Sequence, residues 1–169
     1  LRVLFRFWHE EHILERDFSL FFEAFRVRHP ERVPSFFSKT EILKIENSVS
    51  RSSAVGKRNY AMTLLASRLG LRASDIANLQ FGDIDWDNSL ITLTMKKTQK
   101  VIQLPLLTEV GNAIIDYLKN GRPKSNLKSV FLSSRAPYTG ATKACVCAAI
   151  NGIIVRSGVD INLKHHGPH

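Results

Sequence analysis

The sequence is poor in the features that build secreted scaffolds or membrane proteins. Only two of its 169 residues are cysteine, Cys145 and Cys147, which is too few for a disulfide framework and typical of a reducing intracellular compartment. No apolar run approaches the roughly 18 residues of a membrane span. The first residues lack an initiator methionine, a continuous apolar stretch and a small-residue cleavage site. We therefore expect no signal peptide and an N-terminus cut from a longer chain.

Acidic residues are also scarce relative to basic ones. Asp and Glu number 15 against 24 Lys and Arg, which gives a formal net charge of +9. The excess is concentrated between Lys96 and Lys143, where nine basic residues accompany only Glu109 and Asp116. Such a field attracts a polyanion, and nucleic acid is the common one. A solvated basic surface without a partner would have the same composition, so charge alone leaves the partner open.

The remaining composition is that of an ordinary globular protein. Apolar residues make up 44% and charged residues 23%, which excludes a disordered chain and a collagen-like one. Apolar positions recur at helical spacing along most of the chain, whereas they alternate over residues 90–95 and 101–104. The alternation predicts a β-hairpin with a basic tip. The fold class is therefore predicted to be α+β, mainly helical with one small antiparallel sheet.

Caps, glycines and prolines set the expected element boundaries. Ser38 and Glu41 have the spacing of a capping box, Gly70 follows a strongly apolar helix as its terminator, and two prolines within residues 28–34 predict a linker. Helices are expected over 2–14, from Asp17, from Ser38, and over 57–69, 74–79, 108–120 and 142–157, with short strands over 83–85 and 130–132.

Three short motifs stand in order on a predicted helix, the hairpin and the terminal loop. They occupy residues 70–76 (Gly-Leu-Arg-Ala-Ser-Asp-Ile), 97–106 (Lys-Thr-Gln-Lys-Val-Ile-Gln-Leu-Pro-Leu) and 167–169 (Gly-Pro-His). In this order and spacing they resemble the three signatures of the tyrosine recombinases, the phage-integrase family. The resemblance covers about residues 38–169, which would form a partial catalytic domain. Residues 1–27 are similar to the last helices of the family's core-binding domain, with residues 28–37 as the linker.

The resemblance implies a chemistry and a role for each matching side chain. These enzymes cut one DNA strand by attack of a tyrosine and form a 3′-phosphotyrosyl intermediate, without a metal or another cofactor. Arg72 would clamp the phosphate, because its planar fork binds two oxygens at once. Lys97 would protonate the leaving 5′ oxygen, although counting forward from Arg72 permits Lys96 instead. His169 would donate to the same phosphate, and Asp75 would orient the catalytic groups indirectly.

The implied partner is double-stranded DNA, held mostly through its phosphates. The candidate contacts are Lys96, Lys100, Arg135 and Lys143, with the helix start near Thr142 offering backbone donors. The family further implies a homo-oligomer on DNA, with a tetrameric synapse in the parent protein. A protein of this kind would act in the cytoplasm and be encoded by a bacterium, a phage or a mobile element.

Some parts of the family's site are expected beyond His169, namely its second arginine and the nucleophilic tyrosine. The three tyrosines of the chain, Tyr60, Tyr117 and Tyr138, all precede that histidine, and none is placed to be the nucleophile. We therefore expect a C-terminally truncated integrase that binds DNA but does not cleave it alone. Loss of the terminal helices would expose apolar surface and favour self-association.

Other functions fit parts of the sequence. A non-enzymatic DNA-binding regulator would need only the basic surface, and a protein-interaction domain would use the aromatic N-terminal helices. A zinc site is not expected. Cys145 and Cys147 are two residues apart on a predicted helix and point in different directions, and no other pair is spaced like zinc ligands.

Overall fold

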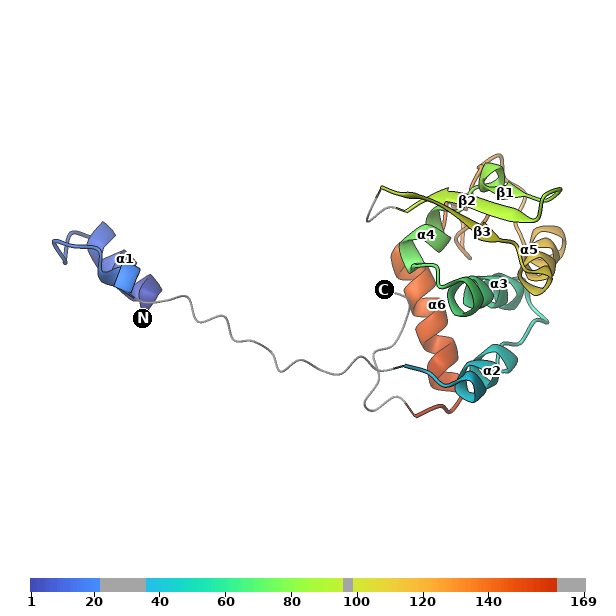
Figure 1. Cartoon of the computed structure of the whole chain (residues 1–169), viewed down its shortest axis with the longest axis horizontal. Helices are drawn as coiled ribbons and strands as arrows, with labels where there is room; N and C mark the ends of the chain where they lie inside the picture. The colour runs from blue at the N-terminus through green and yellow to red at the C-terminus, as the bar shows by residue number, and fades with distance from the viewer. Residues whose placement is uncertain (22–35, 96–98, 161–169) are drawn as a thin grey trace. The chain divides into compact units, whose positions relative to one another are not determined.

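A computed structural model describes residues 1–21, 36–95 and 99–160 (Figure 1). The described residues fall into two compact units, a small one at residues 1–21 and a larger one at residues 36–160. The proposed division into core-binding remnant, linker and catalytic domain stays a prediction. Within the described ranges, no helix is long and apolar enough to cross a membrane.

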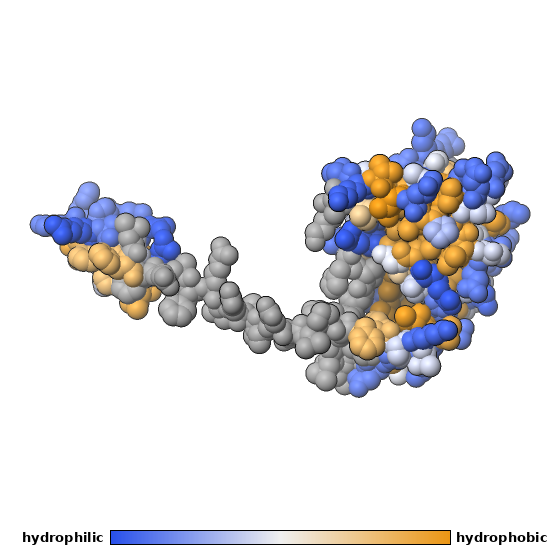
Figure 2. Space-filling model, in the orientation of Figure 1, coloured by the Kyte–Doolittle hydropathy of each residue, from blue (hydrophilic) through white to orange (hydrophobic). Residues whose placement is uncertain are grey.

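The small unit consists of helix α1 (Arg2–Glu10) and the 3-10 helix η1 (Phe18–Phe21). The predicted helix over 2–14 ends four residues early, because His12 adopts a left-handed conformation with φ of +56°. The Ile13 N–H then bonds to the Trp8 carbonyl at 2.9 Å, which closes the helix end. Hydrophobic surface gathers on one side of this unit in Figure 2. Two of its apolar side chains, Val3 and Phe21, are each more than 80% exposed.

The larger unit combines helices with one small sheet, as the α+β prediction requires. Its longest helix, α3, packs against α5, α6, α2 and α4, and α6 also packs against α4. Figure 1 shows the sheet at one end of the unit and α2 at the other. The elements are α2 (Lys39–Asn47), α3 (Ala54–Leu69), α4 (Ala73–Asn78), η2 (Phe81–Asp83), β1 (Ile84–Asp85), β2 (Leu90–Thr94), β3 (Val101–Pro105), α5 (Thr108–Asn120) and α6 (Lys143–Arg156).

Local signals explain where several of these helices begin and end. The Ser38 hydroxyl accepts the Glu41 N–H, and the Glu41 carboxylate accepts the Ser38 N–H at 2.8 Å, so the predicted capping box is present. Helix α3 begins three residues earlier than predicted because Ser53 caps it through the Gly56 N–H. It ends at Gly70, whose φ of +64° turns the chain sharply.

The sheet has the order β1-β2-β3 and is antiparallel throughout. The predicted hairpin is confirmed, with Leu90 opposite Pro105 and Thr94 opposite Val101. On β2, Ile91 and Leu93 are buried while the threonines between them are exposed. This alternation buries one face of the strand against the helices.

The predicted strand at residues 130–132 is wrong. These residues are fully buried, but they make a single isolated bridge, from Leu132 to Gly140. Arg58, a buried arginine on α3, donates from Nη1 to the Leu132 carbonyl at 2.9 Å. Arg122 donates to the carbonyls of Ser129 and Val130. Because side chains satisfy these backbone groups, the segment is buried without a full strand partner.

Candidate active site

Arg72 lies at the junction between α3 and α4, and its backbone is held on both sides. The neighbouring Leu71 and Ala73 are 3% and 0% exposed, so both are anchored in the core. The Arg72 carbonyl accepts the N–H groups of Asp75 and Ile76 at 2.9 and 3.0 Å, which starts α4. Gly70 therefore ends one helix, and Arg72 begins the next, with its own side chain only half-buried.

The guanidinium of Arg72 meets a neutral partner. Its Nη1 donates to the thioether sulfur of Met95 at 3.3 Å, at the end of β2. Among the described residues, no carboxylate lies within the 4.0 Å of an ion pair with Arg72. A thioether is a weak acceptor, so the positive charge of Arg72 is oriented without being neutralised. Such a side chain can take up an anion without first breaking an ion pair.

Asp75 is buried one helical turn beyond Arg72. It is 5% exposed and stands in the first turn of α4, where a carboxylate is favoured by the helix dipole. Together with Asp83 and with Leu93 and Thr94 of β2, it lines a polar cavity of about 390 Å³. The carboxylate therefore faces the strand that leads to Met95. The indirect, orienting role expected for Asp75 stays a prediction.

The hairpin expected to carry the catalytic lysine meets Arg72 at the end next to its turn. The backbone of Met95 is paired in both directions, with its N–H on the Lys100 carbonyl at 2.9 Å and its carbonyl accepting the Gln99 N–H at 2.8 Å. Lys96 and Lys97 follow Met95 directly in the sequence but lie outside the described residues, as does His169. Their convergence on Arg72 stays a prediction.

The other predicted DNA contacts are exposed and come from separate segments. Lys100 stands at the start of the returning hairpin strand, and Arg135 in the loop after the buried 130–132 segment. Lys143 is the first residue of α6, which Thr142 caps by accepting the Cys145 N–H at 3.2 Å. Exposure leaves all three free to reach a phosphate backbone, and their common use in DNA binding stays a prediction.

In the described part of the chain, none of the three tyrosines forms a hydrogen bond with Arg72. Tyr117 is 1% exposed, and its hydroxyl accepts the Leu132 N–H at 3.3 Å. Burial raises the pKa of the Tyr117 hydroxyl, which disfavours the nucleophilic phenolate. Tyr60 lies under the guanidinium of Arg51, 4.8 Å from it, and Tyr138 is an exposed loop residue.

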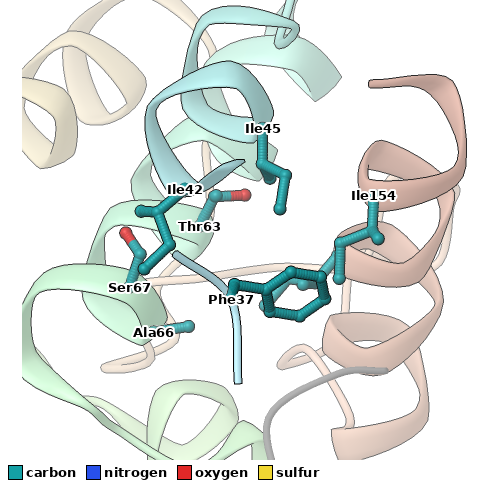
Figure 3. A pocket seen from close by; sticks show the side chains of 8 residues that line it. Phe37, Ile42, Ile45, Thr63, Ala66, Ser67 and Ile154 are labelled. Atoms are coloured by element: carbon teal, nitrogen blue, oxygen red, sulfur yellow. The ribbon is translucent and has the colours of Figure 1, made fainter. Parts of the chain in front are cut away.

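A second hollow lies away from these groups, between α2, α3 and α6. Its volume is about 250 Å³, and Figure 3 shows the Phe37 ring beside Ile154 in it. It is lined by Phe37, Ile42, Ile45, Thr63, Ala66, Ser67, Ile150 and Ile154. The described side chains that line it include none with a charge, and their polar groups are the hydroxyls of Thr63 and Ser67. In the described ranges, no group of three or more His, Cys, Asp or Glu residues is placed to hold a metal ion.

Met95 is the one residue at this site that the sequence reasoning missed. A methionine at the end of an alternating strand is typical of core packing, and Met95 does pack against the core. Its contact with Arg72 joins residues 23 positions apart in the chain. The only sequence signal was its position directly before the lysines of the hairpin.

Comparison with known proteins gives a family and a fold. A family model described as the phage integrase family matches residues 35–169. The protein named "Putative integrase/recombinase y4rA" of Sinorhizobium fredii is 33% identical over 133 residues, which cover 78% of this chain and 32% of that protein. Tyrosine recombinase XerC of Bacillus pumilus is 28% identical over 147 residues, covering 82% of this chain and 47% of XerC. The chain thus spans less than half the length of either relative.

Solved structures show the same arrangement of elements at lower identity. XerA recombinase has a TM-score of 0.66 and 20% identity, covering 81% of this chain and 47% of XerA. A lambda integrase dimer bound to a COC′ core site has a TM-score of 0.63 and 17% identity, covering 97% of this chain and 57% of that one. A lambda integrase tetramer bound to a Holliday junction has a TM-score of 0.61 and 17% identity. The match covers 97% of this chain and 46% of that one.

Proposed function

The chain belongs to the phage integrase family, and we propose on that basis that the whole protein is a site-specific recombinase acting on double-stranded DNA. The observation that carries the proposal is Arg72. Its backbone is fixed between two core residues, and its guanidinium carries no carboxylate partner within the described structure. An arginine oriented in this way is suited to bind a phosphate diester.

In the proposed reaction, a tyrosine oxygen attacks the phosphorus of one strand, the bond to the 5′ oxygen breaks, and the tyrosine is left joined to the 3′ phosphate. One phosphate ester replaces another, so the step consumes no cofactor. The tyrosine proton passes to a base near the phosphate. Arg72 binds the non-bridging oxygens, where negative charge grows in the transition state. Lys97, with Lys96 as the alternative, protonates the leaving oxygen, and His169 donates to the same phosphate.

We propose that the nucleophile is none of Tyr60, Tyr117 and Tyr138. The buried hydroxyl of Tyr117 is engaged with the Leu132 backbone, and Tyr60 is covered by Arg51. The 169-residue chain alone should therefore form no covalent adduct with a nicked suicide substrate. Appearance of such an adduct, mapped to one of these three tyrosines, would overturn this part of the proposal.

The DNA partner and the assembly rest on charge and on the similar structures. The larger unit exposes Lys100, Arg135 and Lys143, and the lambda integrase structures hold DNA as a dimer and as a tetramer. We propose that this protein likewise acts as a homo-oligomer on DNA. In a gel mobility-shift experiment, a duplex that carries two binding sites should form several complexes of different mobility.

Replacement of Arg72 in the whole protein tests the proposal. The DNA substrates for the cleavage assay are duplexes selected from a random pool by their binding to the protein. Arg72→Ala should lower the cleavage rate at least a hundredfold, the cost of losing one charge-stabilising group, while changing DNA affinity only a few-fold. Arg156→Ala, at the end of α6, removes the same charge elsewhere and is the matched control. Equal cleavage by the two variants would contradict the assigned role.

The exposed lysines and arginine also favour a second candidate, a DNA-binding regulator without catalysis. That function predicts that Arg72→Ala weakens binding about as much as removal of any other phosphate-binding side chain does. It also predicts no covalent protein–DNA adduct from the whole protein on any retained duplex. A single adduct that depends on Arg72 would exclude it.

A further inference from the structure

The contact between Arg72 and Met95 connects two rigid parts of the larger unit. Arg72 begins α4, and its backbone is fixed by the buried residues on either side. Met95 ends β2, and its backbone pairs with both Gln99 and Lys100. Only the two side chains are free to change, and they meet through Nη1 and the thioether sulfur at 3.3 Å. The sulfur is therefore placed to orient the end of the arginine relative to the hairpin.

The chemical nature of the partner matters for a side chain that must bind a phosphate. A carboxylate at this place would form a charge-assisted, two-pronged pair with Arg72, and it would repel the phosphate. An aliphatic side chain would offer packing but no acceptor. A thioether lies between these cases, because it is uncharged and accepts hydrogen bonds weakly. It can hold the guanidinium in one direction and still release it to a charged oxygen.

We propose that Met95 is a positioning residue for Arg72: its thioether holds the guanidinium in place before DNA arrives and yields it to the scissile phosphate. The orienting contact belongs to this chain, whereas its consequence for cleavage rests on the proposed function of Arg72. An alternative is that Met95 only fills space against the core, where its side chain is half-buried. The positioning role and the packing role can be distinguished by experiment, because packing does not require the sulfur atom.

The contact can be tested in the 169-residue chain without any recombination assay. The chain has two methionines, Met62 and Met95, and Met62 is fully buried on α3. Labelling the methionine methyl groups with ¹³C therefore gives two NMR signals, of which Met62 is an internal control. Arg72→Lys should shift the Met95 signal and leave Met62 in place, and Arg156→Lys should shift neither. An unchanged Met95 signal in Arg72→Lys would overturn the proposed contact.

The consequence is tested in the whole protein with variants that differ in acceptor strength. Met95→Leu keeps the volume but removes the sulfur, and it should slow cleavage about three- to tenfold, the range of one hydrogen bond, with DNA affinity unchanged. Met95→Glu should slow cleavage more strongly, because the carboxylate competes with the phosphate. Met62→Leu makes the same exchange on α3, away from Arg72, and is the matched control.

A double-mutant cycle shows whether Met95 acts through Arg72. In an Arg72→Lys background, Met95→Leu should have little further effect on cleavage, because the guanidinium that the sulfur orients is already absent. Equal slowing by Met95→Leu in both backgrounds would mean that Met95 acts by packing, and it would overturn the positioning role. If Arg72 itself proved dispensable for cleavage, the proposed function would fail, while the NMR result on the contact would stand.

Discussion

At the residue scale, the described structure pairs one buried charge fully and leaves another charge without an oppositely charged partner. Glu46 on α2 is 5% exposed and fully paired, because it accepts Ser67 Oγ at 2.6 Å and both Nε and Nη2 of Arg68 at 2.9 and 2.6 Å. This pairing raises the pKa of the Arg68 guanidinium. Within the described residues, the hydrogen bond of the Arg72 guanidinium goes to a thioether. A charge that holds α2 on α3 is neutralised, whereas a charge proposed to bind substrate is left available.

We expect the Glu46 pair to contribute to stability. Glu46→Gln keeps the shape but removes the charge that three hydrogen bonds share, so the free energy of unfolding should fall by about 1–3 kcal/mol. Urea unfolding measures the change. Glu109→Gln is the control, because Glu109 is 69% exposed and 3.8 Å from the same arginine, and it should cost under about 0.5 kcal/mol. Similar losses in the two variants would show that burial of Glu46 adds nothing.

At the element scale, helix ends place the candidate site. Helix α3 must stop where it does so that Leu71 turns into the core and Arg72 begins α4. Gly70 makes this possible with a left-handed φ of +64°, which other residues adopt only at a cost. The end of α3 is thus a structural requirement for the position of the arginine two residues later.

Substitution of this glycine should therefore cost conformational energy rather than create a clash. No atom lies within 4 Å of a Cβ built on Gly70. Gly70→Ala should lower the free energy of unfolding by about 1–2 kcal/mol, because alanine resists the left-handed conformation. A Cβ added at Gly82 would also meet open space, but Gly82 has no left-handed φ, so Gly82→Ala is the matched control. Thermal unfolding that shows equal shifts for both would contradict the conformational argument.

At the scale of the whole molecule, the excess of basic residues should govern DNA affinity. Counterion release makes the logarithm of the binding constant fall linearly with the logarithm of salt concentration. Replacing Lys100, Arg135 or Lys143 with glutamine should lower this slope by about 1 for each phosphate that the side chain neutralises. Fluorescence anisotropy of a labelled duplex measures the slope across salt concentrations.

The control for the salt experiment is Lys39→Gln. Lys39 is exposed on α2, which Figure 1 places at the opposite end of the larger unit from the hairpin. Its replacement should leave the slope unchanged. If all four variants changed the slope equally, the attraction would come from net charge alone and would not define a DNA-binding face.

Much of the fold was predictable because its signals are local. The capping box at Ser38, the Gly70 terminator, the hairpin and the helix over 108–120 depend on residues within a few positions of one another, and all are present. Two of the errors, both in helix length, also have local causes. The left-handed His12 shortened the first helix, and the Ser53 cap lengthened α3.

The amino-acid sequence by itself determined the family, the α+β class and the identity of Arg72 as the candidate phosphate ligand. These depend on short motifs and helix caps, which are formed by residues close together in the sequence. Only the tertiary structure decided that residues 130–132 are buried without a full strand partner and that the guanidinium of Arg72 meets the sulfur of Met95. Both depend on contacts between residues far apart in the chain. Periodicity gives the face on which a side chain lies, but not the distant atom that it meets.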